Sequence, residues 1–364
     1  MNIVIMAEYI LKSGVGVYVN ALCKQLKINN NVFMMANEYV FDDNIDIFIK
    51  RNLTKAKPIA LLKNVFYLRK FFKTKKIDVV QMNHRRCAFL MKVYNFVYWF
   101  DKMPCCWILH TQSMPLSLPY RMITYAGNKA IAISSEVRDF LVNKVHIKEN
   151  RVVLILNGID ATKLQPLTSE EKLSIKNKYG IYNDKIVVCA HGRIDKVKGL
   201  DVIVNAVNSL SKEYKDKLIV LLSGDTNNDY CKELQNMISQ FCLNDNFVFM
   251  GWVSPREIFG ISDLAVMPSR REGFPLSAIE AFFMKVPCIR TKTGGYQDMK
   301  MVCDSIEIDN AECLAKKLIA FVDNKNIYDK MTKDAYEFAK LNCTIQVMTQ
   351  NTLAIFESLK KERG

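Results

Sequence analysis

The stretch SDLAVMPSRREGFPLSAIEA occupies residues 262–281 and contains two glutamates separated by seven residues. Its apolar run at 264–269 is typical of a buried strand, and the segment after it is typical of a helix that begins near Pro275. Glu272 is therefore expected in the loop between strand and helix. Glu280 is expected inside the helix, roughly 7 Å along the axis from its start at 1.5 Å per residue.

The start of this predicted helix is expected to bind an anion. The N–H groups of Gly273, Phe274 and Leu276 would point out of the helix start, where the helix dipole also favours negative charge. Glu272 precedes this anion site and Glu280 follows it, and each carboxylate could accept hydrogen bonds from a vicinal diol. A nucleotide sugar presents a hexose, a diphosphate and a ribose in that order, so the spacing indicates a nucleotide-sugar site.

The same alternation of strand and helix extends outward from this stretch in both directions. Predicted strands, rich in β-branched residues, lie at 2–7, 78–82, 106–110, 130–134, 151–156, 185–194, 218–224, 246–253 and 286–291. Amphipathic segments between them, such as 17–26, indicate parallel sheets covered by helices. Ligands of such sheets bind beyond the carboxyl ends of the strands, so we expect the chemistry in strand-end loops.

A polar stretch near residue 165 is the predicted boundary between two domains. Thr168 and Glu171 have the spacing of a capping box for a helix that ends near Tyr179. A chain of 364 residues is long enough for two domains, each with its own core. We therefore expect two doubly wound α/β domains at 1–163 and 164–345, followed by an amphipathic C-terminal helix at 346–364.

Composition and cysteine usage indicate a cytoplasmic globular protein. No apolar run reaches the roughly 18 residues that a membrane-spanning helix needs, and the N-terminus is expected to form a strand rather than a signal peptide. The 11 cysteines and 4 histidines are scattered without a C-x-x-C pair. A structural zinc site is therefore not expected, and the cysteines suit a reducing compartment.

The net charge of +14 lies almost entirely in the first half of the chain. Residues 1–165 contain 24 Lys and Arg against 11 Asp and Glu, whereas residues 166–364 contain 27 against 26. Positive charge of this kind attracts phosphates of nucleic acid, anionic lipid or a phosphorylated substrate. The alternative is a lysine-rich composition that only keeps the protein soluble.

Residues 56–76 combine this charge with apolar side chains. Leu62, Phe66 and Tyr67 lie among basic residues in a predicted amphipathic helix that could lie on an anionic leaflet. An ordinary surface helix that covers the sheet is the alternative. The basic residues are Lys63, Arg69, Lys70, Lys73, Lys75 and Lys76.

Three other strand-end loops carry candidate residues. Arg193 and Lys198 could neutralise a diphosphate leaving group without a metal ion, although surface Lys and Arg are often only solvated. Gly14 and Gly16 open a predicted helix and would allow a phosphate or sugar to approach the backbone, unless they form only a tight turn. His110 follows a strand, where a lone histidine can equally be structural.

With these motifs, the chain resembles the retaining glycosyltransferases of family 4, which have the GT-B architecture of two facing Rossmann-like, doubly wound domains. The E-x7-E element with its G-F-P turn is the specific part of the resemblance. The C-terminal helix is then expected to cross back to the first domain. The matching segments, in family order, are SGVG, WILH, AIAISSEV, VLILNGID, GRIDKVKGLDVIVNAV, FMGWVS, SDLAVMPSRREGFPLSAIEA and TGGYQD.

The resemblance implies a role for each candidate residue. Glu280 should bind the ribose hydroxyls, and Glu272 the hydroxyls of the donor sugar. The backbone of Phe274, Pro275 and Leu276 should assist Glu272. Arg193 and Lys198 should bind the diphosphate, and His110 should contact the transferred sugar. Gly16 should allow close approach of the first domain's loop, and the base should lie near Val253. Asp298 is one methylene shorter than the family's usual glutamate, which leaves the role of its loop open.

We therefore expect a retaining enzyme that moves a hexose or N-acetylhexosamine from a nucleoside-diphosphate sugar to a hydroxyl of a glycan or lipid-linked acceptor. UDP is favoured because it is the commoner carrier, and bacterial surface polysaccharide or lipopolysaccharide is the expected product. No D-x-D motif occurs, so no metal or other cofactor is expected. Peripheral contact with the inner face of the cell membrane is expected through 56–76.

Three alternatives to this reading remain open from the sequence. A nucleotide-sugar epimerase would share the architecture. A glycoside hydrolase would also use paired carboxylates but has no need of a cationic diphosphate loop. A nucleic-acid-binding protein would use the basic first domain, but the chain lacks interleaved aromatic and basic residues and any recognised nucleic-acid motif, so no nucleic-acid partner is expected.

Overall fold

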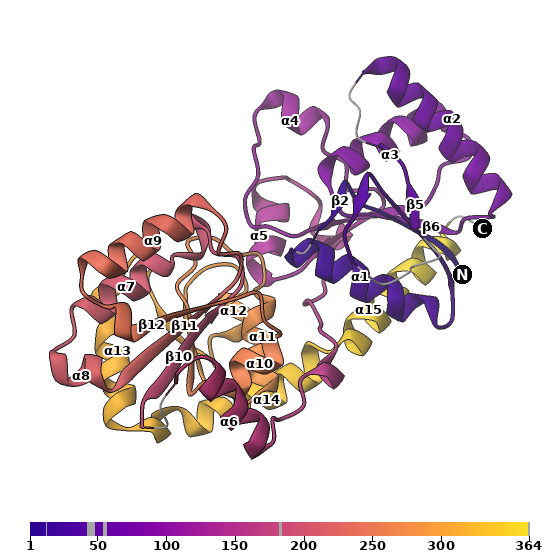
Figure 1. Cartoon of the computed structure of the whole chain (residues 1–364). Coiled ribbons are helices and arrows are strands. Elements are labelled where there is room, and N and C mark those ends of the chain that lie inside the picture. Colours follow the sequence, from indigo (N-terminus) through magenta and orange to yellow (C-terminus); the bar gives the residue numbers. More distant parts are fainter. Residues whose placement is uncertain (12, 42–47, 54–56, 182–183, 363–364) are drawn as a thin grey trace. The chain divides into compact units, whose positions relative to one another are not determined.

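The computed structural model describes residues 1–364 except 12, 42–47, 54–56, 182–183 and 363–364. Ala56, the first residue of the basic stretch 56–76, lies outside the described residues. The chain forms two units, one of Met1–Gly158 with Thr344–Gly364 and the other of Ile159–Cys343 (Figure 1). The chain thus passes between units a few residues before the boundaries expected at 163 and 345.

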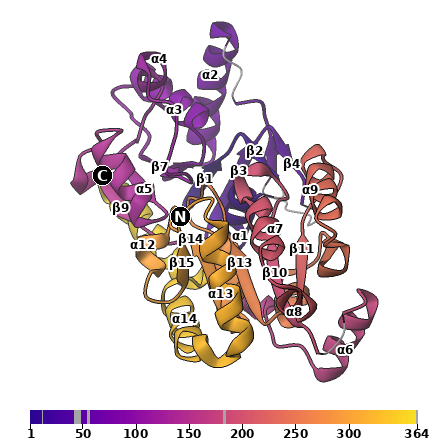
Figure 2. The ribbon, with the colours of Figure 1, turned by 90° about the vertical axis from the view of Figure 1, so that its left-hand side faces the viewer.

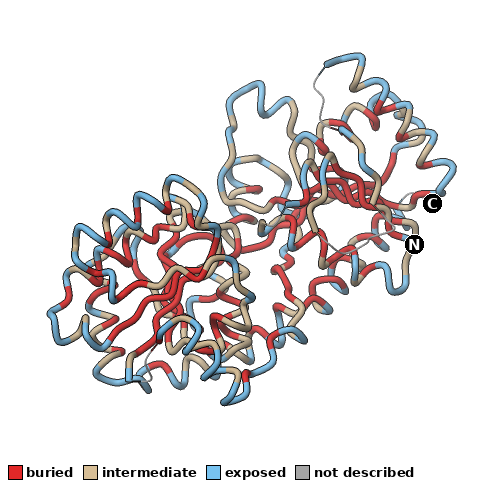
Figure 3. The backbone as a smooth tube through the Cα atoms, viewed as in Figure 1, coloured by how far each residue is buried: buried red, intermediate tan, exposed pale blue. Residues whose placement is uncertain are grey.

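The first unit is built on a parallel sheet with the strand order β5-β3-β1-β6-β7-β8-β9. Its inner strands are buried on both faces, as expected for a sheet that helices cover on both sides (Figure 3). A short parallel pair, β2 (Tyr9–Ile10) and β4 (Glu38–Tyr39), lies beside it. The strands of the main sheet are β1 (Asn2–Met6), β3 (Asn31–Ala36), β5 (Phe48–Lys50), β6 (Val79–Met82), β7 (Cys105–Leu109), β8 (Lys129–Ala132) and β9 (Val152–Leu154).

Helices cover both faces of this sheet. The C-terminal helix α15 (Ile345–Lys361) packs against α1 (Gly14–Lys27), so the last segment of the chain belongs to the first unit (Figure 1). On the other face, α2 (Pro58–Thr74) packs against α3 (Arg85–Val97). The remaining helices of this unit are α4 (Leu118–Met122), α5 (Ser135–Asn143) and the 3-10 turn η1 (Glu149–Arg151).

The second unit contains a parallel sheet with the order β12-β11-β10-β13-β14-β15. The first three strands along the chain add in one direction and the next three in the other, so the order reverses between β10 and β13. That reversal is the topological switch point at which doubly wound sheets bind ligands. The strands are β10 (Ile186–His191), β11 (Leu218–Ser223), β12 (Phe247–Gly251), β13 (Leu264–Met267), β14 (Cys288–Thr291) and β15 (Asp304–Ile306).

Two groups of helices cover this second sheet (Figures 1 and 2). The helices α7 (Leu200–Asn208), α9 (Asp229–Gln240) and α13 (Ala311–Asp323) share one apolar core with the strands. The helices α10 (Pro255–Gly260), α11 (Leu276–Phe283) and α14 (Asp329–Asn342) pack against one another in the second group. Short elements fill the connections: η2 (Ala161–Lys163), α6 (Ser169–Lys178), α8 (Lys212–Asp216), η4 (Asn244–Asn246), α12 (Tyr296–Met299) and η5 (Lys325–Tyr328).

The predicted capping box is present at the start of α6. The Thr168 hydroxyl accepts from the Glu171 N–H at 3.1 Å, and the Glu171 carboxylate accepts from the Thr168 N–H at 2.8 Å. Glu171 also receives two hydrogen bonds from Arg256 of α10, so this cap ties α6 to α10 within the second unit. Within the described ranges, no helix is both long and apolar enough to cross a membrane.

Candidate functional site

The loops that follow β10 and β13 meet at the switch point of the second sheet. Both loops contribute to a pocket at the carboxyl ends of the strands, where an α/β fold is expected to place its ligand. Arg193 and Lys198, which the sequence analysis singled out, both line it. The polar and charged lining residues are His191, Arg193, Lys198, Ser223, Ser269 and Ser277, together with Gly192.

The loop after β10 is shaped by a side-chain cap and a left-handed glycine. Asp195 Oδ1 accepts from the Lys198 N–H at 3.1 Å and so closes the 3-10 turn η3 (Lys196–Lys198). Gly199 then adopts φ +66°, and a Cβ at this position would lie 2.2 Å from the Pro268 carbonyl oxygen. The glycine is therefore needed to bring the loop against the end of β13. Arg193 lies at the rim and pairs with Asp195 at 3.1 Å.

Lys198 and Glu272 form an ion pair between the two loops. The Lys198 Nζ lies 2.7 Å from Glu272 Oε1, and the side chains are only 21% and 13% exposed. Burial alone would raise the pKa of Glu272, but the charge and hydrogen bond of Lys198, with smaller contributions from Ser269 and Arg290, hold that pKa below its usual value. Glu272 is therefore a carboxylate at neutral pH, held beside a cation.

The helix α11 begins one residue later than the sequence suggested. Pro275 has φ −75° and ψ 111°, which is an extended and not a helical backbone conformation. It is therefore the N-cap, and the first turn of the helix begins at Leu276. The Pro275 carbonyl accepts from the Ala278 N–H at 3.2 Å. Across the described residues, no acceptor takes the N–H groups of Gly273, Phe274 or Leu276, so these donors remain available to an anion.

Glu280 occupies the fifth position of α11 and faces a histidine that the sequence analysis did not single out. Its Oε2 lies 4.0 Å from His191 Nε2. The Ser223 hydroxyl donates to the Gly251 carbonyl at 3.0 Å, so its oxygen accepts from His191 Nδ1 at 3.2 Å and Nε2 is left as an acceptor. Both side chains are largely buried, and two adjacent acceptors of this kind suit the hydroxyls of a diol.

Burial shifts both of these groups toward their neutral forms. It raises the pKa of Glu280 to about 7, against the opposing charge of Lys198. Burial and, to a smaller extent, the charge of Lys198 together lower the pKa of His191 to about 4. The Glu280 carboxyl therefore titrates near neutrality while the His191 imidazole stays neutral.

Arg270 fixes the loop that carries Lys198. Its guanidinium donates to both carboxylate oxygens of Asp201 at 2.9 and 2.6 Å and to the Lys196 carbonyl at 2.7 Å. It also donates to Asp309 at 2.7 Å, and its backbone N–H donates to the Val197 carbonyl at 2.7 Å. The sequence placed Arg270 in the right loop but gave no reason to prefer it over its neighbour Arg271, which is exposed.

Arg290 holds the loop that packs against the Glu272 turn. It is 1% exposed and donates to the carbonyls of Gly294 at 2.6 Å and Thr293 at 3.2 Å. A Cβ on Gly294 would lie 2.3 Å from the Glu272 carbonyl oxygen, so this loop lies directly against the turn. The TGGYQD segment therefore shapes the site through backbone packing.

The remaining predicted residues lie elsewhere. Val253 follows β12 and is half-buried, but it is not among the residues that line the pocket. Gly16 and His110 belong to the first unit. A Cβ on Gly16 would lie 1.8 Å from the Leu11 carbonyl oxygen, whereas Gly14 has open space around it. Packing within the first unit is therefore enough to require glycine at position 16.

His110 follows β7 and is enclosed by three elements of the first unit. Its Nε2 lies 3.2 Å from Asn83 Oδ1 at the end of β6. The Tyr18 ring from α1 meets its ring edge-on, with the centroids 4.9 Å apart. Burial lowers the pKa of His110 to about 3, with a further contribution from His84, so the imidazole is neutral at physiological pH.

Two family models match the chain. The model described as "Glycosyltransferase Family 4" matches residues 12–163, and that described as "Glycosyl transferases group 1" matches residues 171–338. Together they account for the central parts of both units.

The individual relatives described next share about a quarter of their aligned residues with this chain. The capsular polysaccharide biosynthesis glycosyltransferase CapM of Staphylococcus aureus is 25% identical over 256 residues, which cover 68% of this chain and 66% of CapM. An uncharacterized glycosyltransferase of Methanocaldococcus jannaschii, MJ1607, is 26% identical over 180 residues, which cover 48% of this chain and 45% of that protein. The matches therefore span less than two thirds of the length of either relative.

Among solved structures, Anabaena HepE in complex with UDP superposes with a TM-score of 0.86. The two sequences are 16% identical, and the superposition covers 98% of this chain and all of HepE. At this identity the likeness concerns the fold.

Proposed function

Because the chain belongs to the group 1 glycosyltransferases of family 4 and has the GT-B fold, we propose that it is a retaining hexosyltransferase that uses a UDP-sugar. The transferred group is a hexose or N-acetylhexosamine, and the acceptor is a hydroxyl of a glycan or lipid-linked glycan. The observation that carries this proposal is the Lys198–Glu272 ion pair beside the open start of α11.

The site suits a diphosphate leaving group. In sugar transfer, positive charge develops at the anomeric carbon while negative charge grows on the departing diphosphate. Lys198, Arg193 and the free N–H groups at the start of α11 would stabilise that negative charge in the transition state. Two cations and a helix start supply this charge from the protein, so the proposed mechanism uses no metal ion.

The carboxylates would then orient the two ends of the donor. Glu272 is ionised and accepts hydrogen bonds from hydroxyls of the sugar, while Lys198 is shared between Glu272 and the diphosphate. Glu280 and His191 Nε2 accept from the ribose hydroxyls, and the base lies near Val253 after β12. The complex of HepE with UDP supports UDP as the carrier for this chain.

The first unit is assigned to the acceptor. By the family resemblance, His110 would lie against the transferred sugar, and Gly16 would allow close approach of the first unit's loop. CapM, a relative named for capsular polysaccharide biosynthesis, supports a bacterial surface polysaccharide as the product. A lipid-linked acceptor would explain the charge of this unit, through contact of the cytoplasmic protein with the inner leaflet.

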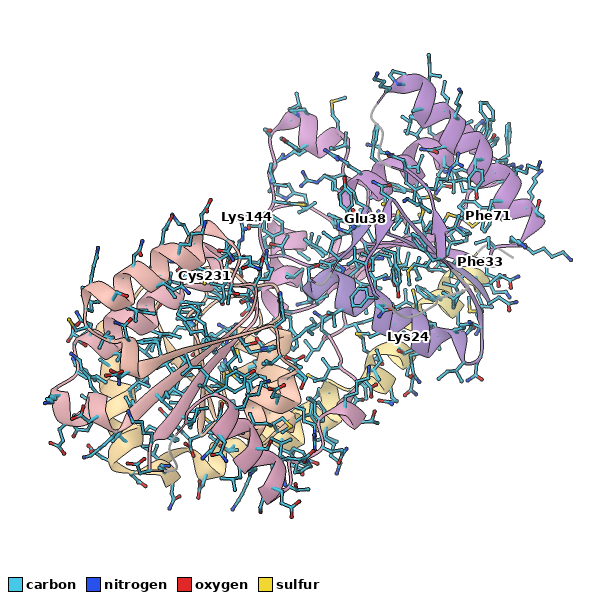
Figure 4. All side chains as sticks on the ribbon, in the orientation of Figure 1. Lys24, Phe33, Glu38, Phe71, Lys144 and Cys231 are labelled. Carbon is cyan, nitrogen blue, oxygen red and sulfur yellow. The ribbon has the colours of Figure 1, made fainter. Side chains whose placement is uncertain are left out.

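The surface of α2 supports that membrane contact. Its inner face is apolar and packs on the sheet, where Phe71 meets Phe33 edge-on at 5.3 Å between ring centroids (Figure 4). Its outer face also carries apolar side chains, and Phe66 is 61% exposed. A helix that only covered the sheet would not need them. Large apolar and basic residues make up most of the exposed positions on and just after α2: Ile59, Leu62, Lys63, Phe66, Lys70, Lys73, Lys75 and Lys76.

The end of α3 and the turn after it also expose aromatic side chains. Phe96 and Phe100 are each 82% exposed, and Trp99 is 61% exposed. Arg69 of α2 contacts this turn, because its Nη1 lies 2.5 Å from Asp101 Oδ2. Exposed aromatic side chains beside lysines are the composition of segments that lie at a membrane interface.

Membrane contact is tested by sedimentation with phosphatidylglycerol-containing vesicles. The chain should sediment with them at low salt and dissociate as salt screens its charges. Phe66→Ser and Trp99→Ser should weaken sedimentation, whereas Leu341→Ser, at an exposed leucine of α14 in the second unit, should not. A chain that stays in the supernatant at low salt would exclude this contact.

Transfer itself is tested with a panel of UDP- and GDP-sugars. A bound donor at 100 times its Kd should add about 2.7 kcal/mol to the unfolding free energy, so a thermal-shift screen identifies it. The nuclear magnetic resonance spectrum of the product should then show the donor's anomeric configuration, and excess EDTA should not slow the reaction. A change of the sugar without acceptor would instead indicate a nucleotide-sugar epimerase.

A further inference from the structure

A short chain of hydrogen bonds in the first unit ends at His110. Asn83, at the carboxyl end of β6, is 4% exposed and donates from Nδ2 to the Met6 carbonyl at 3.2 Å. Its Oδ1 lies 3.2 Å from Gln81 Nε2 and 3.2 Å from His110 Nε2. Met6 ends β1 and Asn83 follows β6, so this chain lies at the switch point of the first sheet.

The direction of these hydrogen bonds is fixed at one end. The Met6 carbonyl can only accept, so the group of Asn83 that faces it must be the NH₂ group. The Asn83 backbone N–H also donates to this carbonyl, at 2.9 Å, which holds the residue in place. The Asn83 oxygen therefore faces His110 Nε2 at 3.2 Å, and two atoms that both presented lone pairs would repel each other at that distance. His110 Nε2 must carry the proton.

His110 Nδ1 is consequently left with a lone pair. None of the described residues forms a hydrogen bond with it. Because burial lowers the pKa of His110 to about 3, the ring does not gain a second proton near neutrality. Nδ1 can accept a hydrogen bond from a hydroxyl, but it repels a carboxylate, which offers no proton.

We propose that Asn83 holds His110 as its Nε2–H tautomer, and that the free Nδ1 selects a neutral, hydroxyl-bearing sugar over a uronic acid. Asn83 acts as a positioning residue, since it reaches the substrate only through His110. The selection of the sugar rests on the proposed function, whereas the tautomer rests only on contacts within the first unit.

The tautomer is measured directly by ¹⁵N resonance of the histidine rings in the full-length protein. The chain has 4 histidines, so replacing His110 by Gln assigns its signals. His110 should show a protonated Nε2 and an unprotonated Nδ1. His191 provides an internal control, because its Nδ1 donates to Ser223 and its spectrum should show the opposite pattern. A protonated Nδ1 on His110 would overturn the proposal.

Two substitutions test the role of Asn83. Asn83→Leu has a similar shape but no acceptor, so the proton of His110 should redistribute from Nε2 toward Nδ1. Asn83→Asp keeps an oxygen at the same place, so Nε2 should stay protonated. The His84 ring should keep an unprotonated Nδ1 in both variants, because this nitrogen accepts from the Glu8 N–H at 3.0 Å, and so reports a correctly folded first unit. An unchanged His110 spectrum in Asn83→Leu would show that Asn83 does not set the tautomer.

Selection of the sugar is read from donor binding, which needs no acceptor. Titration calorimetry should give a Kd for the best neutral donor of the panel that is at least about 10-fold lower than for the corresponding uronate, the scale of one charged contact. In Asn83→Leu this ratio should fall to about 3-fold or less. Equal affinities in the wild type, with the Nε2–H tautomer present, would overturn the selection alone. Binding of neither donor would contradict the proposed function and the selection with it.

Discussion

Lys198 Nζ lies 2.7 Å from Glu272 Oε1, and this contact joins the loop after β10 to the loop after β13. Each residue holds the other in position before any substrate arrives. Removing either one leaves the other largely buried without its partner, which is costly. The ion pair therefore presets both a cation for the leaving diphosphate and a carboxylate for the sugar.

The Glu272→Ala variant should lose most of its transfer activity. We expect kcat/KM to fall by a factor equivalent to at least about 3 kcal/mol of transition-state stabilisation, the scale of one charged contact at the reacting group. Steady-state kinetics with the best donor measure this loss. The matched control is Glu307→Ala, because Glu307 forms an exposed ion pair with Lys292 in the same unit. Near-normal turnover of Glu272→Ala would contradict its assignment.

Arg193→Ala should also cost at least about 3 kcal/mol in kcat/KM if its guanidinium binds the diphosphate. Lys196 provides the control, since it belongs to the same loop but pairs with Glu233 at 3.0 Å on the surface. Lys196→Ala should change kcat/KM by less than about 3-fold. Similar losses in both variants would indicate general loss of charge and not a specific contact.

Glu280 should make stability and donor binding depend on pH near neutrality. Its pKa of about 7 in the folded chain lies above the roughly 4.3 of an unfolded glutamate. The folded state then binds more protons, so the unfolding free energy falls as pH rises from about 5 to 8. Glu280→Gln should remove this loss, which is on the order of 3 kcal/mol at most, as measured by urea unfolding at both pH values.

Donor affinity should change in the opposite direction. The ionised Glu280 carboxylate is the better acceptor for two ribose hydroxyls, so the Kd of a UDP-sugar should fall between pH 6 and 8. The pKa of His191 is about 4, so that residue does not titrate in this range. Glu280→Gln should abolish the dependence, and a pH profile that survives the substitution would assign it to another group.

Arg270→Lys should weaken donor binding, although Arg270 acts only by holding the loop that carries Lys198. A lysine cannot bind both oxygens of Asp201 and also reach the Lys196 carbonyl, so the loop that carries Lys198 should loosen. We expect KM for the donor to rise roughly 10-fold, the effect of one lost charged hydrogen bond. Arg271→Lys, at the exposed neighbouring position, should leave KM unchanged. Equal effects would refute the support role.

Gly16→Ala should destabilise the first unit, whereas Gly14→Ala should not. The added Cβ at Gly16 would overlap the Leu11 carbonyl oxygen and force a backbone shift that costs about 1–3 kcal/mol. At Gly14, the first residue of α1, the same change meets open space and favours a helix. Thermal unfolding of both variants separates the two outcomes, and a tolerated Gly16→Ala would indicate that this glycine is not sterically required.

Much of the fold could be predicted because its signals are local. The capping box at Thr168 and Glu171, and the strand–loop–helix order around Pro275, depend on neighbouring residues alone. Strands without such signals escaped prediction. The strand β3 is NVFMMA, rich in methionine, and β15 has only three residues. Their conformation comes from pairing with β1 and β14, which a local pattern does not contain.

The site shows the same limit. Its charged residues could be predicted from their types and spacing, but their partners could not. Arg270 and Arg271 are identical in type, and only the fold directs one of them toward Asp201. Arg290 lies within the buried strand β14, and the carbonyls that it binds come from the next loop. His191 and Asn83 acquire their importance from contacts across a sheet.

The most direct test of this account is a crystal structure of the chain with a nucleoside-diphosphate sugar. The diphosphate should lie within hydrogen-bonding distance of Lys198, Arg193 and the N–H groups of residues 273–276, with the ribose at Glu280 and the sugar at Glu272. A diphosphate bound away from Lys198 and the start of α11 would contradict it.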